Sequence, residues 1–177
     1  GPSGAGKGTL VTRVRERRSN LGLTVSATTR APRKGEVDGV NYFFLTREEF
    51  DRRVANGEFV EWAEVHGNCY GTLVSEVTSK LASGASLILE IDVQGALQVK
   101  ERFPEAVLIF IKPPSLEVLR ERLVGRGTET PETIELRMAN AADELALADR
   151  YDDVVVNDDL DRATDELVRV LDMHERI

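Results

Sequence analysis

A glycine-rich segment that ends in lysine and threonine opens the chain and most restricts its fold. It nearly matches the phosphate-binding pattern G-x-x-x-x-G-K-[ST]. Glycines let backbone N–H groups converge on phosphate oxygens, and the N-terminus of the following helix adds positive potential. Lys7 supplies a mobile cation that can follow charge on a transferring phosphoryl group. We therefore predict a triphosphate cradle made of Gly1, Pro2, Ser3, Gly4, Ala5, Gly6, Lys7, Gly8 and Thr9.

One position of this segment departs from the pattern and bears on metal binding. Gly8 stands where Ser or Thr usually binds Mg²⁺, and Thr9 carries the nearest hydroxyl. Asp92 closes an apolar run and resembles the carboxylate that orients Mg²⁺ or its waters in phosphoryl-transfer proteins. We expect Mg²⁺ to be held through nucleotide phosphates and water, with Thr9 and Asp92 as candidate protein contacts.

The rest of the chain alternates apolar strands with amphipathic helices, which predicts an α/β fold with a parallel sheet covered on both faces. A cradle of this kind normally follows a buried strand, so we expect a strand upstream of Gly1. Predicted strands after the cradle are 87–91, 107–111 and 154–156, and predicted helices are 9–18, 73–82, 93–102, 116–124, 131–150 and 161–174.

The block between the first helix and the first of these strands has a different sequence pattern. Short strand-like pieces at 23–27, 40–45 and 59–65 are separated by turn signals. A helix over 47–56 interrupts them, and Thr46 with Glu49 makes a capping box at its start. This pattern predicts an insertion with its own small sheet.

Charge and composition exclude several classes of protein. The formal net charge of −8 argues against a general nucleic-acid binder. Lys and Arg gather in residues 1–34, which suits a small anionic ligand. The longest apolar run, residues 106–111, falls far short of the ~20 residues of a membrane span. Cys69 is the single cysteine, so no internal disulfide can form, and a reducing cytoplasm is the expected location.

Several further runs resemble guanylate kinases, and they keep the order and spacing of that family from Gly1 to about residue 171. Together they are more specific than any single motif, and they cover nearly the whole chain. They are residues 26–33, 35–42, 58–63, 67–72, 91–95, 125–130 and 156–160.

The resemblance implies a site for GMP in this insertion. Guanidinium forks bind phosphate bidentately, and guanine offers paired N–H donors that a carboxylate can accept. Glu61 with nearby Asp92 would accept from the base, and the hydroxyls of Ser26 and Thr72 would donate to its O6 atom. The residues implied for GMP are Ser26, Arg30, Arg33, Tyr42, Glu61, Tyr70, Thr72 and Asp92.

The resemblance also implies a lid that closes over ATP. Arg122 and Arg126 lie four apart on one helical face, where Gly125 and Gly127 break the helix. With Arg137 they would stabilise charge during transfer, and Asn157 would lie near the adenine. The residues implied to act in transfer itself are Lys7, Arg30, Arg126 and Arg137.

These features together predict a P-loop NTPase three-layer sandwich with a parallel sheet, a small β-rich GMP-binding insertion and a helical lid. The expected regions are a core of 1–23, 73–118 and 145–177, a GMP region of 24–72 and a lid of 119–144. The expected reaction is reversible Mg²⁺-dependent phosphoryl transfer from ATP to GMP, and to dGMP, without an obligate protein partner, nucleic acid or membrane.

Two alternatives remain open from the residues alone. One is a catalytically inactive guanylate-kinase-like module that binds phosphopeptides, although such modules have degraded cradles and Gly6-Lys7 is intact here. The other is a kinase for a different phosphate acceptor, such as a ribose bisphosphate. Glu61, Thr72 and Asp92 together favour guanine over that reading.

Overall fold

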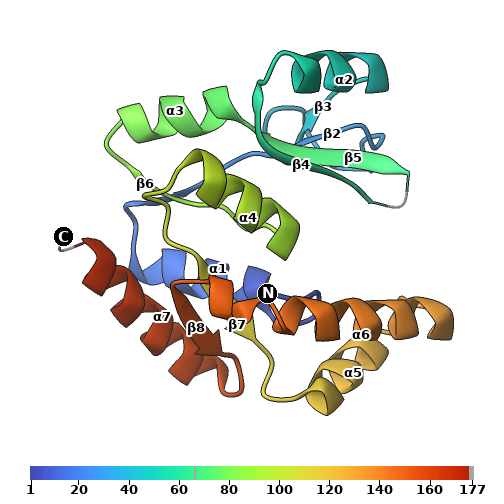
Figure 1. Cartoon of the computed structure of the whole chain (residues 1–177), viewed down its shortest axis with the longest axis vertical. Coiled ribbons are helices and arrows are strands. Elements are labelled where there is room, and N and C mark those ends of the chain that lie inside the picture. The colour runs from blue at the N-terminus through green and yellow to red at the C-terminus, as the bar shows by residue number, and fades with distance from the viewer. Residues whose placement is uncertain (66, 176–177) are drawn as a thin grey trace. The chain divides into compact units, whose positions relative to one another are not determined.

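The structure, a computed structural model, describes residues 1–65 and 67–175 of the chain (Figure 1). The chain divides into two compact units. Unit 1 joins Gly1–Arg18 to the chain from Glu105 onward, and unit 2 is Ser19–Pro104. The predicted core segments 1–23 and 73–118 are therefore each divided between the two units. No helix within the described residues is long and apolar enough to cross a membrane.

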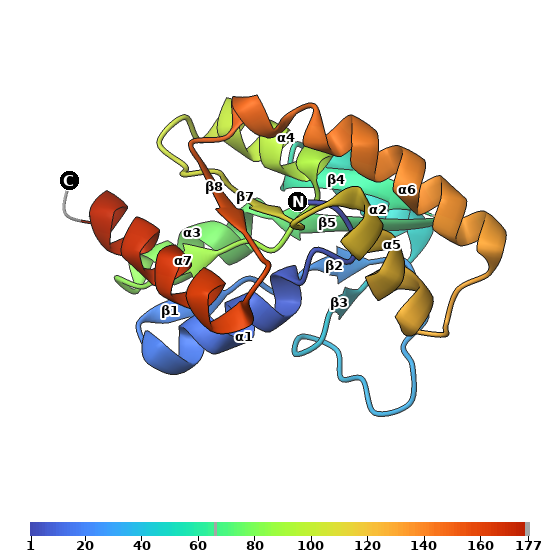
Figure 2. The same cartoon turned by 90° about the horizontal axis from the view of Figure 1, so that it is seen from below.

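Unit 1 is built around a parallel strand pair that helices cover (Figure 2). Ile109 pairs with Asp153, and the register continues to Lys112 with Val156. Phe110 and Val155, at the centre of the pair, are completely buried. Its elements are α1 (Lys7–Arg17), β7 (Ile109–Lys112), α5 (Leu116–Gly125), α6 (Pro131–Leu145), the 3-10 helix η1 (Ala148–Arg150), β8 (Asp153–Val156) and α7 (Leu160–Glu175).

Side-chain caps fix where two helices of unit 1 begin. The Ser115 hydroxyl accepts from the N–H of Val118 at the start of α5. Thr130 caps α6 in the same way, and Pro131 takes the first helical position, where a missing N–H costs nothing. The Gly-Arg-Gly break that the sequence suggests therefore separates α5 from α6, which pack together as a helical pair (Figure 1).

Unit 2 holds a four-stranded sheet of order β3-β2-β5-β4 and a separate parallel pair, β1 with β6. Phe50 of α2 packs with Phe59 of β4, their ring centroids 4.4 Å apart, and this contact anchors α2 on the sheet. Its elements are β1 (Leu21–Leu23), β2 (Ala27–Thr28), β3 (Phe43–Phe44), α2 (Arg47–Ala55), β4 (Phe59–Val65), β5 (Asn68–Leu73), α3 (Val74–Ala82), β6 (Ser86–Ile88) and α4 (Val93–Arg102).

The predicted capping box at α2 is confirmed on its Thr46 side, and it carries a testable stability effect. The Thr46 hydroxyl accepts from the N–H of Glu49 at 3.1 Å. We expect Thr46→Ala to lower the free energy of unfolding by about 1 kcal/mol, because an orphan N–H loses its partner. Urea unfolding measures the difference, and Thr128→Ala at an exposed position is the matched control. An unchanged urea midpoint in Thr46→Ala would contradict the role of this cap.

Two strands were predicted to be longer than they are. Side chains, rather than a neighbouring strand, make hydrogen bonds to part of their backbone. Instead of one strand over 23–27, the chain forms β1 and β2 in different sheets. Between them the Val25 N–H donates to Glu76 of α3 at 2.9 Å, and Lys80 donates to the Leu23 carbonyl. The predicted strand 40–45 shrinks to β3, because Asp38 and Asn41 accept from backbone N–H groups and shape a loop.

Two later elements also end earlier than predicted. The strand expected at 87–91 stops at Ile88, which pairs with Leu23, the last residue of β1. The helix expected to reach residue 150 ends at Leu145 and continues as η1. The tighter turn there brings Tyr151 edge-on to Phe110, with ring centroids 5.0 Å apart. The remaining predicted helices are confirmed, with ends shifted by one or two residues.

Candidate functional site

The glycine-rich segment forms a compact loop that ends at the first residue of α1. Gly6 is the N-cap of α1 with φ of +89°, a backbone conformation that L side chains rarely adopt. The N–H of Ala5 donates to the Pro2 carbonyl, which closes the turn. The loop leads directly into the N-terminus of α1, whose positive potential is the physical basis of an anion site.

Two predicted transfer residues lie on this loop or contact it. Lys7 donates through Nζ to the Gly1 carbonyl, so its cation folds back along the loop. Arg137 of α6 donates to the Ser3 hydroxyl and forms an ion pair with Glu129 at 2.8 Å. Unit 1 therefore brings two cations to the same loop from the start of α1 and from the middle of α6.

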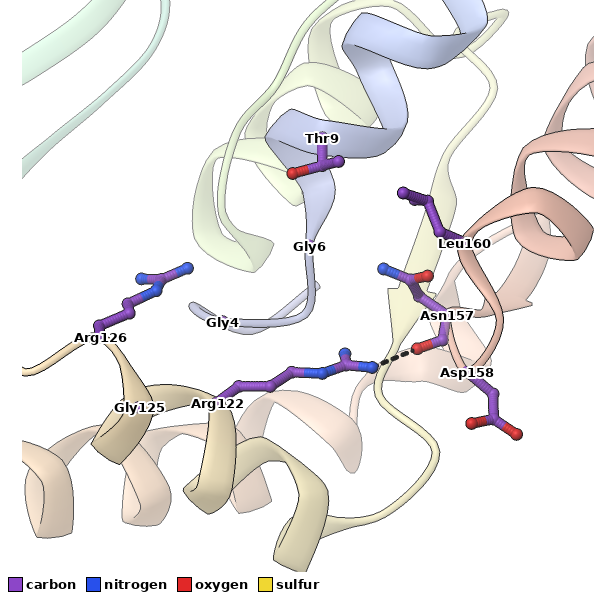
Figure 3. Close-up of a pocket in the computed structure, with 9 residues that line it drawn as sticks. All are labelled: Gly4, Gly6, Thr9, Arg122, Gly125, Arg126, Asn157, Asp158 and Leu160. Atoms are coloured by element: carbon purple, nitrogen blue, oxygen red, sulfur yellow. Dashed lines mark hydrogen bonds between the residues drawn. The ribbon is translucent and has the colours of Figure 1, made fainter.

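An open pocket of about 370 Å³ lies beside the loop (Figure 3). Arg122 extends from α5 and donates through Nη2 to the Asn157 carbonyl at 2.8 Å. Its other terminal nitrogen, Nη1, is buried and makes no hydrogen bond within the described residues. Arg126 is exposed at the end of α5. The lining residues are Gly4, Gly6, Thr9, Arg122, Gly125, Arg126, Asn157, Asp158 and Leu160.

Unit 2 carries a buried carboxylate at the position expected to accept from a base. Glu61 of β4 is 7% exposed, and its Oε1 accepts from the Thr72 hydroxyl on the neighbouring strand β5 at 2.8 Å. Burial raises the pKa of the Glu61 carboxyl. The Thr72 hydrogen bond opposes this shift, and the nearby negative charge of Asp92 adds to it. Thr72 was expected to donate to the base, but in this structure its hydroxyl donates to Glu61.

The N-terminus of α4 lies against this carboxylate. A Cβ built on Gly95 would come within 2.8 Å of Glu61 Oε2, so any other residue there would force the carboxylate to shift. Asp92 is the N-cap of α4, and its Oδ1 accepts from the Gly95 N–H at 2.8 Å. Glu61 is thus held from one side by Thr72 and packed on the other against the first turn of α4.

The arginine run forms a second polar cluster in unit 2. Arg30 makes a two-pronged ion pair with Glu36, at 2.9 and 3.0 Å, and its guanidinium lies 5.2 Å from the Tyr42 ring centroid. Tyr42 meets Tyr70 edge-on at 6.3 Å. Arg33 joins the cluster through its backbone N–H, which donates to Glu36, while its side chain is exposed. The Arg30 guanidinium and this N–H lower the pKa of the Glu36 carboxyl.

Sequence reasoning missed three residues that organise these clusters. Glu36 accepts from the Arg30 side chain and from the backbone N–H of Arg33. The turn between Arg33 and Glu36 was the feature of the sequence that could have indicated this contact. Gly95 gives Glu61 its space, and Thr28, fully buried, donates to the Cys69 carbonyl and accepts from the Arg30 N–H. Ser26 touches the sheet through its carbonyl, which accepts from Phe43.

The chemistry of the donor set fits a metal that is bound mainly by its substrate. Within the described residues no three His, Cys, Asp or Glu side chains gather into a metal cage. The Thr9 hydroxyl lines the pocket beside the loop. Mg²⁺ keeps several waters and binds through substrate phosphates with few protein ligands, so a single hydroxyl beside a phosphate loop suits it.

Comparisons with known proteins agree with this geometry. The sequence model of guanylate kinase matches residues 1–174. Guanylate kinases from Gloeobacter violaceus and Halalkalibacterium halodurans are 57% and 53% identical to the chain, over 97% of it and 83% and 84% of the relatives. A crystal structure of guanylate kinase from Anaplasma phagocytophilum superposes with a TM-score of 0.74 at 39% identity, covering 94% of the chain and 81% of that protein.

The loop, the parallel strand pairs and this structural match define a nucleotide-binding protein of the P-loop NTPase fold, as the sequence predicts. Within that class, the chain belongs to the guanylate kinase family.

Proposed function

We propose that this chain transfers the γ-phosphoryl group of ATP to GMP, giving ADP and GDP, and runs the reaction in both directions. The observation that carries the proposal is the buried Glu61–Thr72 pair in a chain that also presents a glycine-rich phosphate loop. A phosphate loop by itself suits any nucleoside triphosphate. A desolvated carboxylate that can accept two hydrogen bonds restricts the acceptor base to one with paired donors.

The transfer itself needs no nucleophilic side chain. An oxygen of the GMP phosphate attacks the γ-phosphorus in line, a new P–O bond forms, and the bond to the β-phosphate oxygen of ADP breaks. Negative charge on the transferring group is balanced by Lys7 and Arg137, which already contact the loop, and by Arg126. Arg122 carries a buried nitrogen, Nη1, that has no hydrogen bond among residues 1–65 and 67–175, and a phosphate oxygen would satisfy it.

Guanine recognition rests on Glu61. Its carboxylate accepts from N1 and from the 2-amino group, whereas adenine has an unprotonated N1 and no 2-amino group. A site built around such hydrogen bonds rejects a base that lacks the donors by about 10⁴-fold. Because Thr72 donates to Glu61, it orients the carboxylate, and the Ser26 hydroxyl serves as a donor for O6. Asp92 adds negative charge on the donor side of the base.

Phosphate recognition rests on Arg30, Arg33, Tyr42 and Tyr70. A phosphate offers planar pairs of oxygens that match the guanidinium fork, as the Glu36 carboxylate does in this structure. Glu36 thus acts as an internal anion that keeps Arg30 extended over Tyr42 until GMP binds.

Substitution of Arg30 tests this clamp. We expect Arg30→Met to raise the KM for GMP about 100-fold, since each lost hydrogen bond to a charged group is worth about 1.5–3 kcal/mol. The KM for ATP should change little. Arg47→Met, which removes an exposed arginine of the same unit, is the control. The double variant Arg30→Met/Glu36→Gln separates two effects of the single substitution: loss of the guanidinium fork, and the negative charge of a Glu36 carboxylate that has lost its partner. An equal rise in both KM values would contradict the clamp.

Mg²⁺ completes the proposal as the metal that accompanies ATP. It would be held by nucleotide phosphates and water, with Thr9 as its protein contact in the pocket and Asp92 as a second candidate. When bound, it would supply positive charge that balances the negative charge of the nucleotide phosphates. The Asp92 carboxylate already caps α4 through Oδ1, so its contact with the metal would use the other oxygen.

Three further parts of the proposal concern regions, acceptor range and location. Residues 24–72 serve as the GMP region and 119–144 as the lid over ATP, with 1–23, 73–118 and 145–177 as the core. Closure of the lid excludes water that would otherwise hydrolyse ATP. The reaction extends to dGMP, because none of the proposed contacts uses the 2′-hydroxyl. A cytoplasmic location suits Cys69, which is buried and is the single cysteine of the sequence.

A coupled assay of ADP release, with ATP, Mg²⁺ and each of GMP, dGMP, AMP, CMP and UMP, tests the proposal. Turnover with the two guanine nucleotides alone is the expected result. Turnover with another acceptor would keep the phosphate loop and overturn the role of Glu61. Tight GMP binding without any turnover would instead indicate a binding module.

A further inference from the structure

Asn157 connects three elements of unit 1 that are distant in sequence. It follows β8 directly, and its N–H donates to the Lys112 carbonyl at the end of β7. Its side-chain Nδ2 donates to the Ala5 carbonyl of the phosphate loop at 2.9 Å, and its own carbonyl accepts from Arg122 at 2.8 Å. With 6% of its surface exposed, this residue is among the few buried polar residues of the chain.

The Asn157 amide and the loop are in direct contact. A Cβ built on Gly6 would come within 2.3 Å of Asn157 Nδ2, so the amide occupies the space that any side chain at Gly6 would need. Figure 3 shows the amide directed toward the ribbon at Gly6. The loop therefore packs against the Asn157 side chain at Gly6, the residue that immediately precedes α1.

The hydrogen bond to Ala5 limits what else the amide can do. An amide that turned to read the base of the donor nucleotide would leave the Ala5 carbonyl without its partner in a buried environment, which costs free energy. A donor that stays on Ala5 fixes the orientation of that carbonyl through the hydrogen bond at 2.9 Å. Carbonyl oxygens that turned toward the phosphates would repel them.

We propose that Asn157 is a positioning residue of the phosphate loop. It fixes the Ala5–Gly6 peptide so that the loop presents N–H groups to phosphate, and through its carbonyl it ties Arg122 to the same frame. This inference rests on the proposed function only for the identity of the ligand as a polyphosphate. Its effect acts on every triphosphate equally, whatever the base.

Binding of inorganic tripolyphosphate isolates this effect, because the probe has phosphates and no base. We expect Asn157→Ala to weaken binding of Mg²⁺–tripolyphosphate about tenfold or more, measured by calorimetry. The loss should be the same factor for ATP and for GTP. Asn157→Asp keeps the volume and replaces the donor with an acceptor, so its loss at pH 7.5 should be at least as large. Lowering the pH should restore part of it, since a protonated carboxyl can donate to Ala5.

Asn140→Asp, at an exposed position on α6, controls for the added charge. GMP binding and the thermal midpoint, measured on each variant, control for damage to the fold. Should Asn157→Ala fail to fold, Asn157→Asp carries the test. Weaker ATP binding with unchanged tripolyphosphate binding would overturn the proposal in favour of a base contact. Absence of tripolyphosphate binding to the unmodified chain would also overturn the proposal. Weakened tripolyphosphate binding in a chain that lacks ATP:GMP transfer would overturn the proposed function and leave this inference standing.

Discussion

Replacing Lys7 with methionine is expected to lower kcat by about 10³-fold while leaving the fold intact. Removal of a single group aimed at transition-state charge costs about 10²–10³-fold in other enzymes, and Lys7 is a full charge on the loop itself. Methionine keeps the length and most of the apolar volume of the side chain. Methionine cannot donate to the Gly1 carbonyl, so that hydrogen bond is lost. The loop keeps the turn closed by the Ala5 N–H on the Pro2 carbonyl and the N-cap at Gly6.

Single-turnover measurements at saturating ATP and GMP separate this effect from weaker binding. Arg13→Met is the matched control, because it removes a cation from the exposed face of the same helix, where a pair with Asp161 contributes little to stability. The thermal midpoint of Lys7→Met should equal that of the unmodified chain within about 2 °C. A kcat within tenfold of the unmodified value would rule out Lys7 as the residue that balances charge in transfer.

Glu61→Gln should have the second largest effect, on the acceptor base. An amide presents one acceptor where the carboxylate presents two, so a donor of guanine loses its partner. We expect the KM for GMP to rise about 100-fold, with no change in the KM for ATP, and the preference for GMP over AMP to fall by a similar factor. Steady-state kinetics with both acceptors measure the two values, and Glu64→Gln, exposed on the same strand, is the control.

The same variant should be more stable than the unmodified chain at neutral pH. Because the pKa of Glu61 is raised on folding, the folded chain binds more protons than the unfolded chain between the two pKa values. Stability therefore falls as pH rises through that window, and glutamine escapes this cost while still accepting from Thr72. Equal stability of the two chains from pH 4 to pH 8 would contradict the burial of an ionised Glu61. GMP affinity of the unmodified chain should also fall as Glu61 becomes protonated.

Local rules predict most of the secondary structure, and the reason lies in particular residues. Thr46, Ser115 and Thr130 begin helices because each accepts from an N–H three residues ahead, a bond within one turn. The phosphate loop is equally local, because its shape follows from glycines at fixed offsets. The strand over 23–27 was wrong because Glu76 and Lys80, about fifty residues away, satisfy its backbone.

The candidate sites are predictable where chemistry requires a residue type, and not where a residue acts through a neighbour. Glu61 and Arg30 stand out because base and phosphate recognition demand a carboxylate and a guanidinium. The hydrogen bond from Asn157 to Ala5 joins residues that are 152 positions apart in the sequence. The close approach of Gly95 to Glu61 arises only once the chain has folded. No sequence pattern encodes these contacts.

In the proposed function, the pairing of Arg30 with Glu36 makes capture of the GMP phosphate an exchange of one anion for another. A guanidinium left bare would attract chloride, bicarbonate or any small anion at cellular concentrations. Here an incoming ion has to compete with a carboxylate that is tethered six residues away and binds through both oxygens. A monovalent ion brings a single negative charge to that competition, whereas a phosphate monoester carries a second charge and, in the proposed function, a base that Glu61 also binds. In the proposed function, Glu36 therefore disfavours weakly bound anions at Arg30.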